Sequence, residues 1–180
     1  MIINLLSIIF VIVLDLVTKA EITSLLENKG SSIVLFENFI SLQQVRNEGA
    51  TFGIFANNKF VLIVIPIILC LGLLIFLTLS YIKEIKKEKF SYKFLYKTNP
   101  LYIGITFIIG GGIGNLYDRI KFSYVRDFIR YDFIEAITKK PFGVGNMADL
   151  LLVFGVFIII IYLFIMLYQD YKKSKSGKIK

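Results

Sequence analysis

The chain has 180 residues, 56% of them hydrophobic, and its mean hydropathy of +0.72 excludes an ordinary water-soluble domain of this size. It contains no histidine and a single cysteine, Cys70, which excludes a disulfide and a cysteine–histidine zinc site and leaves paired carboxylates as the favoured hydrolytic groups. The net charge of +8 does not indicate nucleic-acid binding, because the basic residues are not interleaved with aromatic residues along a polar groove.

Four apolar segments have about the length needed to cross a bilayer as helices, roughly 20 residues. They are residues 2–17, 60–81, 101–116 and 150–168. The first segment lacks a basic start and a small-residue cleavage site, so we expect a membrane span and not a cleaved signal peptide. The first and third segments end at polar motifs, at Asp15 and Asn115, which predicts helices that stop at the depth of a functional site.

Positive charge is concentrated in two places, the loop 82–100 and the tail 169–180. Together these segments hold 11 basic and 3 acidic residues, so they carry a net charge of +8 while the rest of the chain is neutral. The positive-inside rule then predicts that this loop, the tail and both termini are cytoplasmic, and that the first and third loops lie outside.

Two segments outside the spans have patterns of their own. Between residues 31 and 55, apolar residues alternate roughly with polar ones, which favours a small outer sheet. From Phe128, apolar residues recur at helical spacing through Tyr131, Ile134 and Ile137, which predicts a short amphipathic helix in the interface. The predicted fold is therefore an all-α membrane protein, one domain over residues 1–180, with four transmembrane helices, a small extracytoplasmic β-sheet and a short interfacial helix.

Asp15 and Lys19 are the first polar residues of interest. They are four residues apart at the end of the first span, so on a helix they share one face and can form an ion pair. A structural pair that caps the span is one interpretation, and support of a functional site is the other.

A second polar motif, Asn47-Glu48-Gly49-Ala50-Thr51-Phe52-Gly53, follows the predicted outer strands. Its glycines permit a tight turn that would direct the Asn47 amide inward.

The third span ends in a glycine-rich motif that continues to Arg119. Gly110 and Gly114 form a G-x-x-x-G pair, which permits close approach of another helix. A phosphate-binding loop is excluded because the required lysine and the preceding strand are missing. Asn115, Asp118 and Arg119 share a helical face, so we expect Arg119 to pair with a carboxylate and Asp118 to remain ionised.

Asp127 and Asp149 are the strongest candidates for chemistry. Each lies where a loop meets an apolar run, and a carboxylate at that depth is costly unless it has a function. The structural alternatives are an ordinary interfacial acid for Asp127 and a helix-start aspartate for Asp149.

Taken together, the motifs resemble those of the signal peptidase II family, the bacterial lipoprotein signal peptidases, which are membrane aspartyl proteases. The matches occur in order along the chain: Asp15-x-x-x-Lys19, Asn47-x-Gly49-Ala50-x-Phe52, Gly114-Asn115-x-x-Asp118-Arg119, Val125-x-Asp127-Phe128 and Asn146-x-Ala148-Asp149. Two departures concern the outer loop. Gly145 stands where an aromatic residue usually precedes the last motif, and the segment 127–149 is a few residues longer than is typical.

The resemblance implies a role for each matched residue. Asp127 and Asp149 would be the catalytic pair. Substrate-site residues would be Asn47, Gly49, Asn115, Arg119 and Asn146, and supporting residues would be Asp15, Lys19 and Asp118. The family also implies a prolipoprotein substrate with a diacylglyceryl-modified cysteine, cleaved just before that cysteine, in the bacterial cytoplasmic membrane, with the active site near the outer face. No metal or other cofactor and no nucleic acid is expected, membrane lipid is an expected partner, and we expect a monomer.

Two other functions fit parts of the sequence. A small proton- or cation-coupled transporter would use Asp15, Asp118 and Asp149, but it would need carboxylates near the bilayer midplane, and these lie at span ends. A presenilin-like protease would need G-x-G-D, and the nearest stretch ends instead in Asn115.

Overall fold

The computed structural model describes residues 2–30, 32–49, 58–87 and 99–177. Its helices are α1 (Ile2–Lys29), α2 (Lys59–Lys87), α4 (Pro100–Phe122), α5 (Asp132–Thr138) and α6 (Met147–Gly177), and its strands are β1 (Ser32–Phe36), β2 (Ile40–Asn47) and β3 (Val125–Arg130). Among the described residues, four helices are long and apolar enough to cross a membrane: α1, α2, α4 and α6. The predicted fold class is therefore confirmed.

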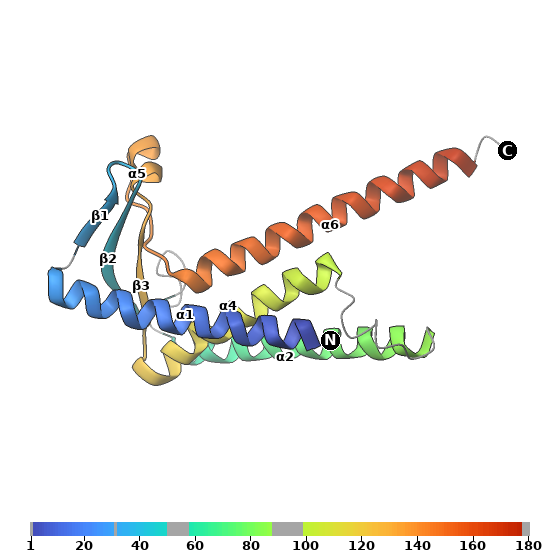
Figure 1. Ribbon diagram of the computed structural model, residues 1–180, viewed down its shortest axis with the longest axis horizontal. Helices are drawn as coiled ribbons and strands as arrows, with labels where there is room; N and C mark the ends of the chain where they lie inside the picture. The colour runs from blue at the N-terminus through green and yellow to red at the C-terminus, as the bar shows by residue number, and fades with distance from the viewer. Residues whose placement is uncertain (1, 31, 50–57, 88–98, 178–180) are drawn as a thin grey trace.

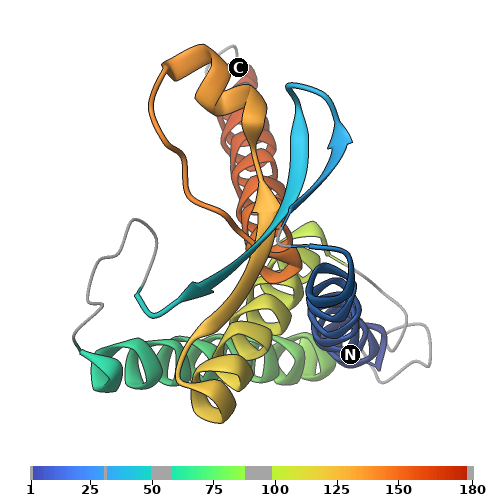
Figure 2. The same ribbon diagram turned by 90° about the vertical axis from the view of Figure 1, so that its left-hand side faces the viewer.

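The sheet and α5 lie at one end of the long helices, and both marked ends of the chain lie toward the other (Figure 1). The strands are antiparallel in the order β1-β2-β3. Figure 2 shows β2 and β3 crossing side by side in front of the long helices, with β1 next to β2. Asn38, at φ 57°, makes the turn between β1 and β2, in a left-handed conformation that asparagine tolerates better than most residues.

α4 is the central helix and contacts α1, α2 and α6, because glycines remove side chains along its length. A methyl group on Gly110 would meet Val11 of α1, and one on Gly111 would lie 2.7 Å from the carbonyl oxygen of Ala148 in α6. The helix starts at a capped position, where the Asn99 side chain accepts a hydrogen bond from Leu101 N. The prediction that the Gly110–Gly114 pair permits helix packing is thus confirmed.

Two apolar clusters hold these elements together. One lies between α1, α2 and α4 and includes Ile8, Leu77 and Ile109. The other joins the end of α1 to the sheet through Leu26, Leu42 and Phe128. Since Phe128 is 2% exposed and follows Asp127 directly, the second cluster fixes the position of that carboxylate relative to α1.

Three expectations need correction. α1 and α4 do not end at Asp15 and Asn115 but continue to Lys29 and Phe122, because those polar side chains find partners on neighbouring helices and the backbone has no cause to stop. Phe128 belongs to β3, a strand that was not predicted, and the amphipathic helix begins only at Asp132. The outer sheet takes its third strand from this later segment. The part of the predicted sheet region from residue 50 to 55, which includes Phe52, Phe55 and the turn from Ala50 to Gly53, lies outside the described residues.

The contact between α4 and α6 generates a prediction for stability. A methyl group on Gly155 would lie 2.6 Å from the Gly104 carbonyl oxygen, which is backbone and cannot turn aside. We expect Gly155→Ala to lower the free energy of unfolding by about 1–3 kcal/mol. Thermal unfolding of the purified protein in detergent micelles measures the effect.

Gly72→Ala is the matched control, because Gly72 is also in a long helix but has open space around its α-carbon. It should leave the melting temperature unchanged or raise it slightly through helix propensity. Equal melting temperatures for the two variants would contradict the assignment of Gly155 to a close helix contact.

Candidate active site

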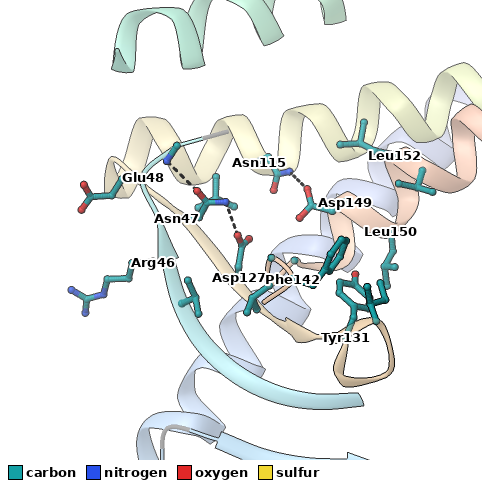
Figure 3. Close-up of a pocket in the computed structure, with 18 of the residues that line it drawn as sticks. Arg46, Asn47, Glu48, Asn115, Asp127, Tyr131, Phe142, Asp149, Leu150 and Leu152 are labelled. Carbon is teal, nitrogen blue, oxygen red and sulfur yellow. Dashed lines mark hydrogen bonds between the residues drawn. The ribbon is translucent and has the colours of Figure 1, made fainter. Parts of the chain in front are cut away.

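Asp127 and Asp149 come from different elements and line the same cavity. Asp127 lies in β3, opposite Val45 of β2, and Asp149 is the third residue of α6. The cavity has a volume of about 830 Å³. Figure 3 shows both carboxylates directed into it, each with a hydrogen-bonded asparagine beside it.

Asn146 connects the two carboxylates. Its side-chain Nδ2 donates to Asp127 Oδ1 at 2.6 Å, and its backbone N donates to Asp149 Oδ2 at 3.1 Å. In return, its Oδ1 accepts a hydrogen bond from Asp149 N at 3.1 Å. This reciprocal pair is a capping box at the start of α6, and it satisfies two backbone donors while holding the side chain of Asp149 in place.

Asn115 lies beneath Asp149 and is oriented by three hydrogen bonds. Its Nδ2 donates to Asp149 Oδ1 at 2.8 Å. Its Oδ1 accepts from Lys19 Nζ at 2.8 Å and from Asn146 Nδ2 at 3.1 Å. The ammonium of Lys19 can only donate, so it fixes which end of the amide faces the carboxylate.

Asn47 completes the hydrogen bonding of Asp127. Its Nδ2 donates to Asp127 Oδ2 at 2.8 Å, and its Oδ1 accepts from Gly49 N at 3.0 Å. The second bond closes a tight turn at the end of β2 and directs the amide nitrogen inward, which confirms the predicted turn. Each oxygen of the two carboxylates thus accepts a hydrogen bond from an uncharged group.

Burial changes the acidity of Asp127. The side chain is only 2% exposed, and this desolvation, together with the negative charge of Asp149, raises its pKa to about 6. Hydrogen bonds from Asn47 and Asn146 and the charge of Lys19 act in the opposite direction. Asp127 therefore holds a proton at a pH where an ordinary aspartic acid has lost it.

Asp15, Lys19 and Asp118 form a buried ionic cluster under the site, and each is 0% exposed. Lys19 Nζ is 2.7 Å from Asp15 Oδ2 and 3.6 Å from Asp118 Oδ2. The other oxygen of Asp15 accepts a hydrogen bond from Ala148 N at 2.9 Å, in the first turn of α6. The carboxylate of Asp15 occupies the space where a side chain on Gly114 of α4 would lie, so only glycine fits at that position.

Asp118 and Arg119 have different partners from those expected. Asp118 binds Arg126, with Nη2 2.8 Å from Oδ1 and Nε 3.1 Å from Oδ2, and also accepts Arg126 N at 3.0 Å. Arg119 points into the cavity and donates from Nη2 to the Gly49 carbonyl at 3.2 Å. Its Nε is buried without a partner among the described residues. The expected pairing of Arg119 with a carboxylate is not found there, because the turn at Ser123 brings Arg126 back onto Asp118 instead.

Comparisons with known proteins decide the family. The family model described as signal peptidase (SPase) II matches residues 7–165. The chain belongs to the signal peptidase II family.

Curated relatives and solved structures agree with this assignment. The lipoprotein signal peptidase of Clostridium tetani is 36% identical over 84% of this chain and 86% of its own length. That of Clostridium novyi is 34% identical, over 88% and 95% respectively. A bacterial membrane enzyme structure at 2.3 Å resolution matches with a TM-score of 0.66 and 26% identity, over 89% of this chain and 87% of that one.

As a signal peptidase II, the protein is a multi-pass membrane peptidase that removes signal peptides from lipoprotein precursors. The transporter alternative is not favoured.

In the part of the chain that the structure describes, no group of three or more Asp, Glu, His or Cys side chains is arranged to hold a metal ion.

The structure brings the ten residues to which the resemblance gives a catalytic, substrate-site or supporting role into one connected region around the cavity. It also adds residues that the sequence did not single out. Arg126 occupies the variable position of the Val125-x-Asp127 motif. The one feature of the sequence that could have pointed to Arg126 is its positive charge next to the candidate carboxylate Asp127. Tyr131 and Phe142 line the cavity from the segment after β3, and Tyr131 was read only as part of an apolar helix face.

The ionic cluster generates a second prediction. Lys19→Met leaves the buried Asp15 without a counter-charge, and removing one partner of a buried pair typically costs about 3–5 kcal/mol. We expect a large fall in melting temperature together with loss of peptidase activity. Lys121→Met, at an exposed lysine on the end of α4, is the control and should behave as wild type. A Lys19→Met protein as stable as that control would show that the buried Asp15 does not need the positive charge of Lys19.

Proposed function

We propose that this signal peptidase II is an aspartic endopeptidase that cleaves prolipoproteins just before a diacylglyceryl-modified cysteine, with Asp127 and Asp149 as its catalytic pair. The observation that carries the proposal is the contact of Asn146 with both carboxylates, which aims two acids from separate elements at one cavity. Paired carboxylates in unlike surroundings can divide the roles of acid and base.

The surroundings indicate which carboxylate holds the proton. Asp127 is buried in the sheet, and its raised pKa of about 6 favours the protonated acid. Asp149 lies in the first turn of α6, where the helix dipole favours a negative charge. Asp149 is therefore the general base and Asp127 the general acid at the start of the reaction.

The reaction then follows in two steps. Asp149 takes a proton from a water molecule as the water oxygen bonds to the scissile carbonyl carbon, while Asp127 gives its proton to the carbonyl oxygen. In the second step Asp149 passes its proton to the amide nitrogen, the carbon–nitrogen bond breaks, and Asp127 recovers a proton from the tetrahedral hydroxyl. The products are a new carboxyl end on the signal peptide and a free amine on the lipidated cysteine.

The walls of the cavity suit a lipidated peptide. Arg119 lines the cavity, and its guanidinium offers N–H donors to a peptide carbonyl. Leu150, Leu152 and Val153 line the α6 side with apolar surface. Burying an acyl chain there contributes about 0.8 kcal/mol per CH₂, so binding energy comes mainly from lipid while polar groups set the register of the peptide.

The charge pattern supports an orientation for this enzyme. The sheet lies at the opposite end of the helices from both marked chain ends (Figure 1), and the lysine-rich tail begins within the last turns of α6. With that end in the cytoplasm, the cavity would lie near the outer face of the bacterial cytoplasmic membrane. The enzyme would act there as a monomer without a cofactor, and substrate would enter laterally from the lipid.

Removing either catalytic carboxylate should abolish the reaction. We expect Asp127→Asn and Asp149→Asn to reduce cleavage of a lipidated precursor by at least a thousandfold, since neither amide can transfer the required proton. A gel-shift assay with purified enzyme measures cleavage. Asp132→Asn is the control, because Asp132 pairs with Arg130 outside the cavity. Near-normal processing by either dyad variant would refute the assignment.

The acid–base assignment also predicts a pH dependence. The active form needs a proton on Asp127, so kcat/KM should fall as the pH rises through about 6, where the free enzyme loses that proton. Asn47→Ala removes a hydrogen bond that favours the ionised form, and it should therefore move this descending limb to higher pH. A limb that stays in place, or moves to lower pH, would mean that the proton is not on Asp127.

A further inference from the structure

The absence of a side chain at Gly145 creates a small space next to the catalytic pair. A methyl group built on Gly145 would lie 3.2 Å from Asp149 Oδ2 and 3.3 Å from Tyr131 Oη. The carboxylate oxygen and the phenol oxygen therefore border the same space from two sides. Gly145 itself is held firmly, because its carbonyl accepts hydrogen bonds from Phe128 N at 2.8 Å and Ile129 N at 2.7 Å.

Tyr131 is held in place by its aromatic neighbours. Its ring packs edge-to-face on Phe142, with centroids 5.8 Å apart, and on Phe133, with centroids 6.4 Å apart. All three rings line the cavity. Figure 3 shows the Tyr131 hydroxyl on the side of its ring that faces Asp149. The ring contacts account for the position of the side chain but leave the hydroxyl without a partner among the described residues.

We propose that Tyr131 is a third catalytic residue, whose phenol oxygen and Asp149 Oδ2 together hold the attacking water. The inference rests on the proposed aspartic mechanism. The water donates one hydrogen bond to each oxygen, which leaves a lone pair to attack the scissile carbonyl carbon. Asp149 removes the water proton that is hydrogen-bonded to its Oδ2. Tyr131 neither gains nor loses a proton, so the reaction still balances as written above.

The chemistry of the phenol suits this role. Burial, followed by the negative charges of Asp149 and Asp127, raises the pKa of Tyr131, so the group stays neutral over the working range of pH. A neutral oxygen accepts a hydrogen bond from water without adding a second negative charge beside Asp149. Fixing the orientation of a nucleophile in this way lowers the barrier of the chemical step and has little effect on substrate binding.

The test compares two tyrosine variants of the purified full-length enzyme on a lipidated precursor. Tyr131→Phe keeps both ring contacts and removes only the oxygen. We expect kcat to fall about tenfold or more while KM and the melting temperature stay within error of wild type. Tyr124→Phe is the matched control, because Tyr124 does not line the cavity and its ring contacts with Arg46 and Phe122 survive loss of the hydroxyl. It should retain wild-type kcat.

Gly145→Ala tests the same space from the other side. The methyl group pushes the two oxygens apart, so this variant should also lose kcat, and combining it with Tyr131→Phe should add little further loss. Unchanged kcat in Tyr131→Phe, a change in KM alone, or a loss that follows a lower melting temperature would each overturn the proposal. These outcomes differ from failure of the proposed function, in which Asp149→Asn would still cleave or the wild-type enzyme would not.

Discussion

The first turn of α6 is the constraint on which the site depends, because the hydrogen bonds that cap this helix also hold Asp149, one of the two proposed catalytic carboxylates. A helix start leaves backbone donors without partners, and here Asn146, Asp149 and Asp15 accept or exchange those hydrogen bonds. The carboxylate of Asp149 therefore cannot rotate without breaking the cap. Helix formation itself fixes the position of Asp149, and Asn146 then connects it to Asp127.

Charge compensation in a low-dielectric environment explains the second layer of the site. Asp15 and Asp118 share one buried ammonium, and Asp118 has a second cation in Arg126. This arrangement supplies Asn115 with a charged donor, and so a fixed orientation, without placing a positive charge directly against Asp149. A cation in contact with Asp127 or Asp149 would favour the ionised form of both carboxylates, and the pair would then lose the proton that the proposed acid catalysis needs.

The sequence predicted features that depend on local pattern and missed those that depend on distant pairing. Four apolar segments, the Asp15–Lys19 pair and the turn after Asn47 follow from composition and spacing alone. β3 was missed because Phe128, Tyr131 and Ile134 also fit a helical period, and only pairing with β2 and with Gly145 decides between the two. The partner of Asp118 was missed because a left-handed residue, Ser123, reverses the chain and returns Arg126 to α4.

The pairing of β3 also limits how a peptide can bind. Near Asp127 one edge of β3 pairs with β2 and the other is bridged by Gly145, so a substrate cannot add to the sheet there as another strand. The groups left to hold it are side-chain donors such as Arg119 and the apolar wall of α6. Without a ladder of backbone hydrogen bonds, the residues around the cut would contribute little to affinity in the proposed reaction, and the lipid on the cysteine would supply most of the binding energy. The proposed enzyme would then process precursors of varied sequence and reject those that carry no lipid.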